Sequence, residues 1–135
     1  MAALNAKVND LGQTPLHIAV TKGHVHIVER LVELMSEDDL EIQDDSGMTA
    51  MSLASALGDT RMLECMHQKN KKLLTIRDPE GRIPFLVALQ AGKIELANYL
   101  YRVTPKEDLI EDAKGEFDSS LITALIMGNA LGKDL

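Results

Sequence analysis

Apolar residues recur along the chain at spacings that predict pairs of short helices. Leu16, Ala19 and Val20 lie at the spacing of one face of a helix that begins near residue 15 and ends near Gly23. A longer stripe follows, and we expect its members to face inward together: Ile27, Val28, Leu31 and Val32. The predicted unit is therefore a turn, a helix, a second turn and a second helix.

The glycines repeat this unit along the chain. One set consists of Gly12, Gly47, Gly81 and Gly115, spaced by 35, 34 and 34 residues. A second set, which follows the first by 11, 11, 11 and 13 residues, consists of Gly23, Gly58, Gly92 and Gly128. A period in this range indicates a stack of repeats.

Local residue types predict how each unit begins. Gly12 supplies a positive φ in a tight turn, which the side chain of Asn9 can brace. Thr14 can cap the first helix, and Pro15 is tolerated at the first helical position. In the third unit Ile83 replaces the threonine, so we expect that helix to lack a side-chain cap.

From Asn9 to Ala19 the sequence is Asn-Asp-Leu-Gly-Gln-Thr-Pro-Leu-His-Ile-Ala, and Gly-His and Ile-Val follow it. This run resembles an ankyrin repeat. The resemblance implies an all-α solenoid of helix-turn-helix units with projecting hairpin loops, in which His17 joins neighbouring turns through the backbone. We expect one array over residues 1–135, with repeats at 9–43, 44–77 and 78–111 and a truncated fourth repeat at 112–135. The motif positions are Gly12, Thr14, Pro15, Leu16, His17, Gly23, Gly47, Thr49, Gly58, Gly81, Pro84, Gly92, Gly115 and Gly128.

The divergent third and fourth repeats and the acidic connectors resemble one subfamily, the plant ankyrin-repeat membrane proteins of the accelerated-cell-death type. This resemblance implies the cytosolic ankyrin domain of a larger, membrane-attached signalling or defence protein. The uncovered apolar residues at 121–126 also lead us to expect a fragment of a longer protein. A free soluble adaptor or targeting subunit is the alternative.

Composition removes several other classes of protein. Aromatic residues make up 3% of the chain, and its net charge is −7, which disfavours base-stacking surfaces and binding to nucleic-acid backbones. The single cysteine, Cys65, excludes an internal disulfide and fits a cytoplasmic setting. The longest nearly apolar stretch, residues 121–131, is about half of the ~20 residues that span a bilayer, so we expect no membrane insertion by this segment.

Candidate chemistry is equally sparse. The sequence has no glycine-rich phosphate loop and no nucleophile elbow, and one cysteine with four histidines does not provide a spaced set of zinc ligands. We therefore expect no enzyme, no cofactor and no metal site. A metal-dependent enzyme is the remote alternative, which stoichiometric zinc in purified protein would reveal.

The segments that connect one repeat to the next differ in charge. Residues 37–41 contain four acids, whereas the next connector carries Lys69, Lys71 and Lys72. Solvated connectors are one interpretation. The other is a bipolar face that steers a partner.

The ankyrin resemblance implies that a monomer binds a protein partner without chemistry, on a concave face made of the projecting turns and the exposed ends of the first helices. The corresponding residues are Asp10, Leu11, Gln13, Thr21, Lys22, Asp45, Ser46, Met48, Ala56, Leu57, Pro79, Glu80, Arg82, Gln90 and Ala91. Met48 and Leu57 would form an apolar centre between Lys22 and Arg82. The alternative is that Met48 and Leu57 pack on adjacent turns.

Overall fold

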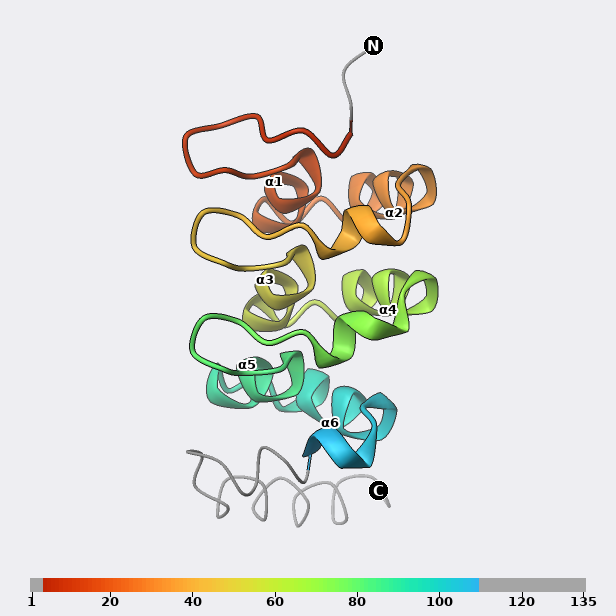
Figure 1. The fold of residues 1–135 in the computed structure, drawn as a ribbon. Coiled ribbons are helices and arrows are strands. Elements are labelled where there is room, and N and C mark those ends of the chain that lie inside the picture. The colour runs from red at the N-terminus through yellow and green to blue at the C-terminus, as the bar shows by residue number, and fades with distance from the viewer. Residues whose placement is uncertain (1–3, 110–135) are drawn as a thin grey trace.

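Helices lie in two parallel columns in a computed structural model that describes residues 4–109 (Figure 1). One column consists of α1 (Pro15–Thr21), α3 (Ala50–Leu57) and α5 (Pro84–Gln90). The other consists of α2 (Val25–Leu34), α4 (Thr60–Lys69) and α6 (Ile94–Val103). Two 3₁₀ turns, η1 (Asp38–Glu41) and η2 (Lys71–Thr75), lead from one helix pair to the next. No strand occurs between residues 4 and 109, so the described fold is all-helical, as predicted.

The core lies between successive helix pairs and between the two columns. Helix α3 packs against both α1 and α5, and α4 packs against α2 and α6. The middle pair therefore has a neighbour on each side, and the α4 residues Met62, Leu63 and Met66 are fully buried. Burial in a solenoid depends on such contacts between neighbouring repeats.

Side-chain caps begin two of the three first helices. Thr14 accepts a hydrogen bond from the backbone N–H of His17, and Thr49 accepts one from Ser52 at 3.1 Å. Ile83 occupies the same position before α5, is fully buried and provides no side-chain cap, as predicted. The sequence interpretation missed Asp59, whose carboxylate caps α4 by accepting from the Met62 N–H at 3.1 Å.

The projecting loops are hairpins held by the same bonds in every described repeat. Oδ1 of Asn9 accepts from two loop N–H groups, those of Leu11 and Gln13, each at 3.0 Å. Oδ1 of Asp44 and Oδ1 of Asp78 accept from the equivalent pairs of N–H groups at 2.9–3.0 Å. The prediction that Asn9 braces its turn is therefore confirmed, and Asp44 and Asp78 brace the equivalent turns in the same way. All six motif glycines in the described range have positive φ, namely Gly12, Gly23, Gly47, Gly58, Gly81 and Gly92. Gly115, Gly128 and the truncated fourth repeat lie outside the described residues.

The predicted inward stripe of the second helix is partly wrong. Val28 and Val32 are buried, but Ile27 is 50% exposed and Leu31 is only half-buried. Ile27 and Leu31 line an open apolar pocket together with Val8, Pro15 and Ile18. Helical spacing alone does not distinguish a face that is covered by a neighbour from one that is not.

Candidate functional site

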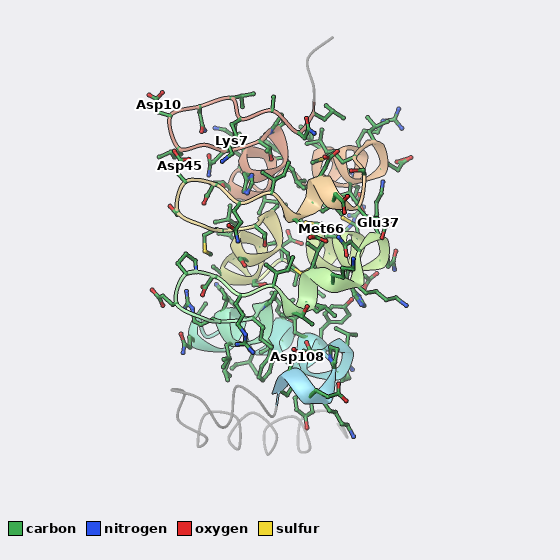
Figure 2. All side chains as sticks on the ribbon, viewed as in Figure 1. Lys7, Asp10, Glu37, Asp45, Met66 and Asp108 are labelled. Carbon is green, nitrogen blue, oxygen red and sulfur yellow. The ribbon has the colours of Figure 1, made fainter. Side chains whose placement is uncertain are left out.

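We use the name loop face for the fifteen residues that the sequence assigns to partner binding, on the hairpin loops and the exposed ends of α1, α3 and α5. Twelve of the fifteen are exposed. The other three, Gln13, Met48 and Arg82, are half-buried and all directly follow a loop glycine. Figure 2 shows Asp10 and Asp45 on the projecting loops, on the opposite side of the molecule from Glu37. Most of the predicted residues are thus accessible to a partner.

Two kinds of contact join the loops to one another. The backbone N–H of Asp45 donates to the carbonyl oxygen of Leu11 at 2.9 Å, which links the first loop to the second. Pro79 takes the place of Asp45 in the third loop and has no N–H to donate. Its ring lies instead against Gly47 of the second loop. The loop tips are therefore held side by side, first by a hydrogen bond and then by packing.

The cationic rim predicted for this face is weaker at Arg82 than at Lys22. The Arg82 guanidinium contacts Asp78 at 2.8 Å and Glu80 at 3.4 Å, and its Nη1 donates to Oε1 of Gln90 at 2.9 Å. Only 19% of the Arg82 side chain is exposed, so its charge is largely neutralised by its own repeat. Arg82 ties the third loop to the end of α5, whereas Lys22 is exposed.

Apolar surface is present at the predicted centre and extends to the first loop. Leu57 is 50% exposed at the end of α3, Leu11 is 62% exposed, and Met48 is half-buried. The sequence interpretation missed Lys7, whose Nζ lies 4.0 Å from Oδ1 of Asp45 (Figure 2). The sequence offered one signal for this contact, because Lys7 lies two residues before Asn9, which braces the first loop.

His17 links the first two repeats, as the resemblance implies. The Thr14 N–H donates to Nδ1 at 3.1 Å, so Nε2 carries the ring hydrogen and donates to the Met48 carbonyl at 2.9 Å. The ring is buried, and this burial lowers its pKa below the usual value. The neutral imidazole therefore holds the second loop in place beneath the loop face.

The groups that could carry chemistry are occupied by structural contacts. Burial raises the pKa of Cys65 to about 11, and its Sγ donates to the Met62 carbonyl at 3.2 Å. His67 contacts the hydroxyl of Tyr99 through Nδ1 at 3.1 Å. Among residues 4–109, no group of three His, Cys, Asp or Glu side chains is placed to hold a metal ion.

The oppositely charged connectors lie next to each other, away from the loop face. Nζ of Lys69 donates to the Val32 and Glu33 carbonyls at 2.6 and 3.1 Å, at the end of α2. Nδ2 of the buried Asn70 donates to the Glu37 carbonyl at 2.9 Å and to the Glu41 carboxylate at 2.8 Å. Part of this charge therefore fastens one repeat to the next.

Comparison with known proteins agrees with this architecture. The family model described as "Ankyrin repeats (3 copies)" matches residues 2–73. The "Nuclear factor NF-kappa-B p105 subunit" of Gallus gallus is 36% identical over 94 residues, which are 68% of this chain and 9% of that protein. The "Ankyrin repeat-containing protein P1E11.10" of Schizosaccharomyces pombe is 33% identical over 130 residues, 92% of this chain and 60% of that protein. The human "Calmodulin-binding transcription activator 2" is 29% identical over 110 residues, 74% of this chain and 9% of that protein.

The repeated hairpins, helix pairs and family match define an ankyrin-repeat protein interaction module. The chain belongs to the ankyrin-repeat family. It spans only part of the length of each of these three relatives. These matches do not test the narrower plant resemblance, which stays a prediction. No helix in the described part of the chain is long and apolar enough to cross a membrane.

Proposed function

We propose that the chain is a non-catalytic module that binds one protein partner through the loop face. The observation that supports this proposal is the contrast between the loop scaffold and its exposed side chains. The three bracing residues make the same pair of backbone bonds in each repeat. The two positions that follow them are occupied by Asp-Leu, Asp-Ser and Pro-Glu.

This arrangement lets side chains on the loop face differ without altering the fold. Asp10, Ser46 and Glu80 are exposed and lie on loops whose geometry is fixed by buried or braced backbone groups. A partner would meet apolar surface at Leu11 and Leu57 among charged and polar groups. Apolar contact surrounded by a polar rim is the usual anatomy of a protein interface.

The proposal is tested by Leu57→Glu, with Leu34→Glu as a matched control. Both leucines are exposed, 50% and 58%, but Leu34 lies at the end of α2, outside the loop face. A partner recovered with the wild-type chain and then purified should bind Leu57→Glu at least about tenfold more weakly, since an interface hot spot exceeds ~1.4 kcal/mol. Equal binding of the two variants, with unchanged melting temperatures, would contradict the proposal.

For the whole protein, we propose a cytosolic setting in which this array is one part of a larger, membrane-attached plant protein. The support is the resemblance of the acidic connectors and divergent repeats to that subfamily. A free monomeric adaptor in the cytoplasm is the competing version. Sequencing the parent transcript beyond Leu135 tests the proposal, because several long apolar segments are expected there.

A further inference from the structure

The connector between the first two repeats carries an exposed serine that is followed directly by acids. The sequence from Ser36 to Asp39 is Ser-Glu-Asp-Asp. Ser36, Glu37 and Asp38 are exposed, and Asp39 is half-buried. Figure 2 shows Glu37 on the side of the molecule opposite the projecting loops, so this connector lies apart from the loop face.

The hydroxyl of Ser36 is held by its own turn rather than by the core. Its Oγ accepts a hydrogen bond from the Asp39 N–H at 3.2 Å, and the Ser36 N–H donates to Oδ2 of Asp39, also at 3.2 Å. The neighbouring residues Met35 and Leu40 are buried and anchor the turn at its two ends. The hydroxyl therefore lies at a defined place on the surface, where a modifying enzyme can reach it.

The other serines in the described part of the chain provide a contrast. Ser46 is also exposed, but the three residues after it are uncharged, and Ser52 and Ser55 are buried. A serine kinase with a basic substrate groove selects acids after its target, because complementary charges across an interface favour one substrate over another. Of the four serines between residues 4 and 109, Ser36 combines exposure with such an acidic run.

Phosphoryl transfer to Ser36 requires a nucleoside triphosphate and the kinase. Oγ of Ser36 attacks the γ-phosphorus, an O–P bond forms, the bond to the departing nucleoside diphosphate breaks, and a carboxylate of the kinase takes up the hydroxyl proton. The product adds up to about two negative charges and three acceptor oxygens to the connector. Four carboxylates already lie close to this position in the sequence, namely those of Glu37, Asp38, Asp39 and Glu41.

An open pocket of about 280 Å³ adjoins the Ser36 side chain, between the first and the second connector. The pocket is lined by Ser36, Glu37, Asp38, Glu41, Asn70 and Lys72. Lys72 is the one base in this lining, and it is exposed, so water screens its charge. Lys69 already donates to two carbonyl groups at the end of α2. A phosphate on Ser36 would therefore meet more repulsion from acids than attraction from lysines.

This repulsion would act on the bonds that hold the connector. Oδ1 of Asp39 accepts from Nδ2 of Asn5 at 3.0 Å, and the Glu41 carboxylate accepts from Nδ2 of Asn70 in the next connector at 2.8 Å. The hydrogen bonds from Asn5 and Ser36 lower the pKa of Asp39, so this carboxylate is charged at neutral pH. Displacement of either carboxylate by a phosphate would break one of these bonds and loosen the first connector.

We propose that Ser36 is a phosphorylation site for an acid-directed serine kinase, and that its phosphate loosens the connector between the first and second repeats. This site is separate from the loop face, and the proposal does not depend on partner binding there.

Incubation of the full chain with ATP, Mg²⁺ and an acid-directed kinase of the casein-kinase type tests the site. Mass spectrometry of proteolytic fragments should find one phosphate on Ser36 and none on Ser46. Asp38→Asn should slow the reaction about threefold or more, which is the contribution of one exposed ion pair to the kinase. Asp38 makes no hydrogen bond or ion pair with another residue between 4 and 109, so this variant should keep the fold. Asp45→Asn, the matched control next to Ser46, should leave the rate unchanged.

Amide hydrogen exchange tests the effect of the phosphate. The N–H groups of Leu40 and Ile42 donate within the connector to the carbonyl groups of Glu37 and Asp39. In the phosphorylated chain these two amides should exchange about fivefold faster or more, and a phosphatase should restore the original rates.

Three results would overturn the proposal. The first is no phosphate on Ser36, or equal phosphorylation of Ser36 and Ser46. The second is an Asp38→Asn chain that reacts as fast as the wild type, because the kinase would then not use the acidic run. The third is exchange at Leu40 and Ile42 that the phosphate leaves unchanged or slows, because the lysines would then outweigh the acids.

Discussion

Replacing Gly47 by alanine should destabilise the protein more than the same replacement at Gly23. Both glycines have positive φ, 82° and 75°, which alanine rarely adopts. At Gly23 an added Cβ would meet no described atom within 4 Å, whereas at Gly47 it would lie 2.5 Å from Cγ of Pro79. Gly23→Ala therefore reports backbone strain alone, and Gly47→Ala reports the same strain together with a clash between two loops.

The magnitudes follow from these two contributions. A left-handed conformation costs alanine ~1–2 kcal/mol, which is the whole effect expected at Gly23. Overpacking adds ~1–3 kcal/mol at Gly47, because the Pro79 ring is rigid and cannot rotate away. We therefore expect Gly47→Ala to lower the free energy of unfolding by about 2–5 kcal/mol. For a domain of this size, each kcal/mol lowers the melting temperature by about 4 °C.

Urea and thermal melts followed by far-UV circular dichroism would measure both variants. Pro79→Ala provides the decisive control, since it removes the ring that the new Cβ would meet. In that background Gly47→Ala should show only the strain, and the double-mutant cycle should give a coupling energy of ~1–3 kcal/mol. Equal losses at Gly23 and Gly47, or a coupling near zero, would refute this account of the loop contact.

Three further outcomes follow from the inner contacts. Burial lowers the pKa of His17, so as the pH falls below about 6.5 the imidazole takes up a proton in the unfolded chain before it does so in the folded chain. Repeat 1 should therefore become less stable below this pH. In the His17→Gln variant, the urea midpoint should lose this part of its pH dependence. Thr49→Ala should lower the free energy of unfolding by ~1 kcal/mol, because the Ser52 N–H loses its acceptor; an unchanged urea midpoint would contradict the cap. In hydrogen exchange the amides of α4, with a helix pair on each side, should outlast those of α2, and the reverse order would contradict nearest-neighbour stacking.

The predictable part of this fold is the part that each repeat determines locally. A glycine with positive φ, an Asn or Asp three residues before it, and a Thr at a helix start each act within about five residues, so their roles could be predicted from spacing. The missing cap at Ile83 was predictable for the same reason. Asp59 is the exception, because a cap at the second helix has no counterpart in the first repeat, where His24 provides none.

Contacts between repeats were harder to predict, because one repeat's sequence does not show what its neighbour presents. Lys7 reaches Asp45 in the next loop, and Lys69 reaches two carbonyls at the end of α2. Ile27 and Leu96 have the same apolar character but opposite burial, which only the position of each repeat in the stack explains. The sequence predicts Arg82 as a charge at the rim of the loop face, but the loop geometry places its guanidinium against the Asp78 carboxylate.

The hydrogen bonds that set the spacing of the repeats are made mostly by groups other than the exposed side chains at the loop tips. Register along the stack depends on buried or partly buried groups, including the His17 bond to the Met48 carbonyl and the Asn70 bonds to the preceding connector. At the loop tips the spacing also depends on the Asp45 N–H bond to the Leu11 carbonyl and on the Pro79 ring, which packs against Gly47. Substitutions at Asp10 or Ser46 therefore alter what a partner meets while the positions of the loops stay fixed. Exposed positions whose chemistry can change while the loop geometry stays the same are what a family of binding modules requires.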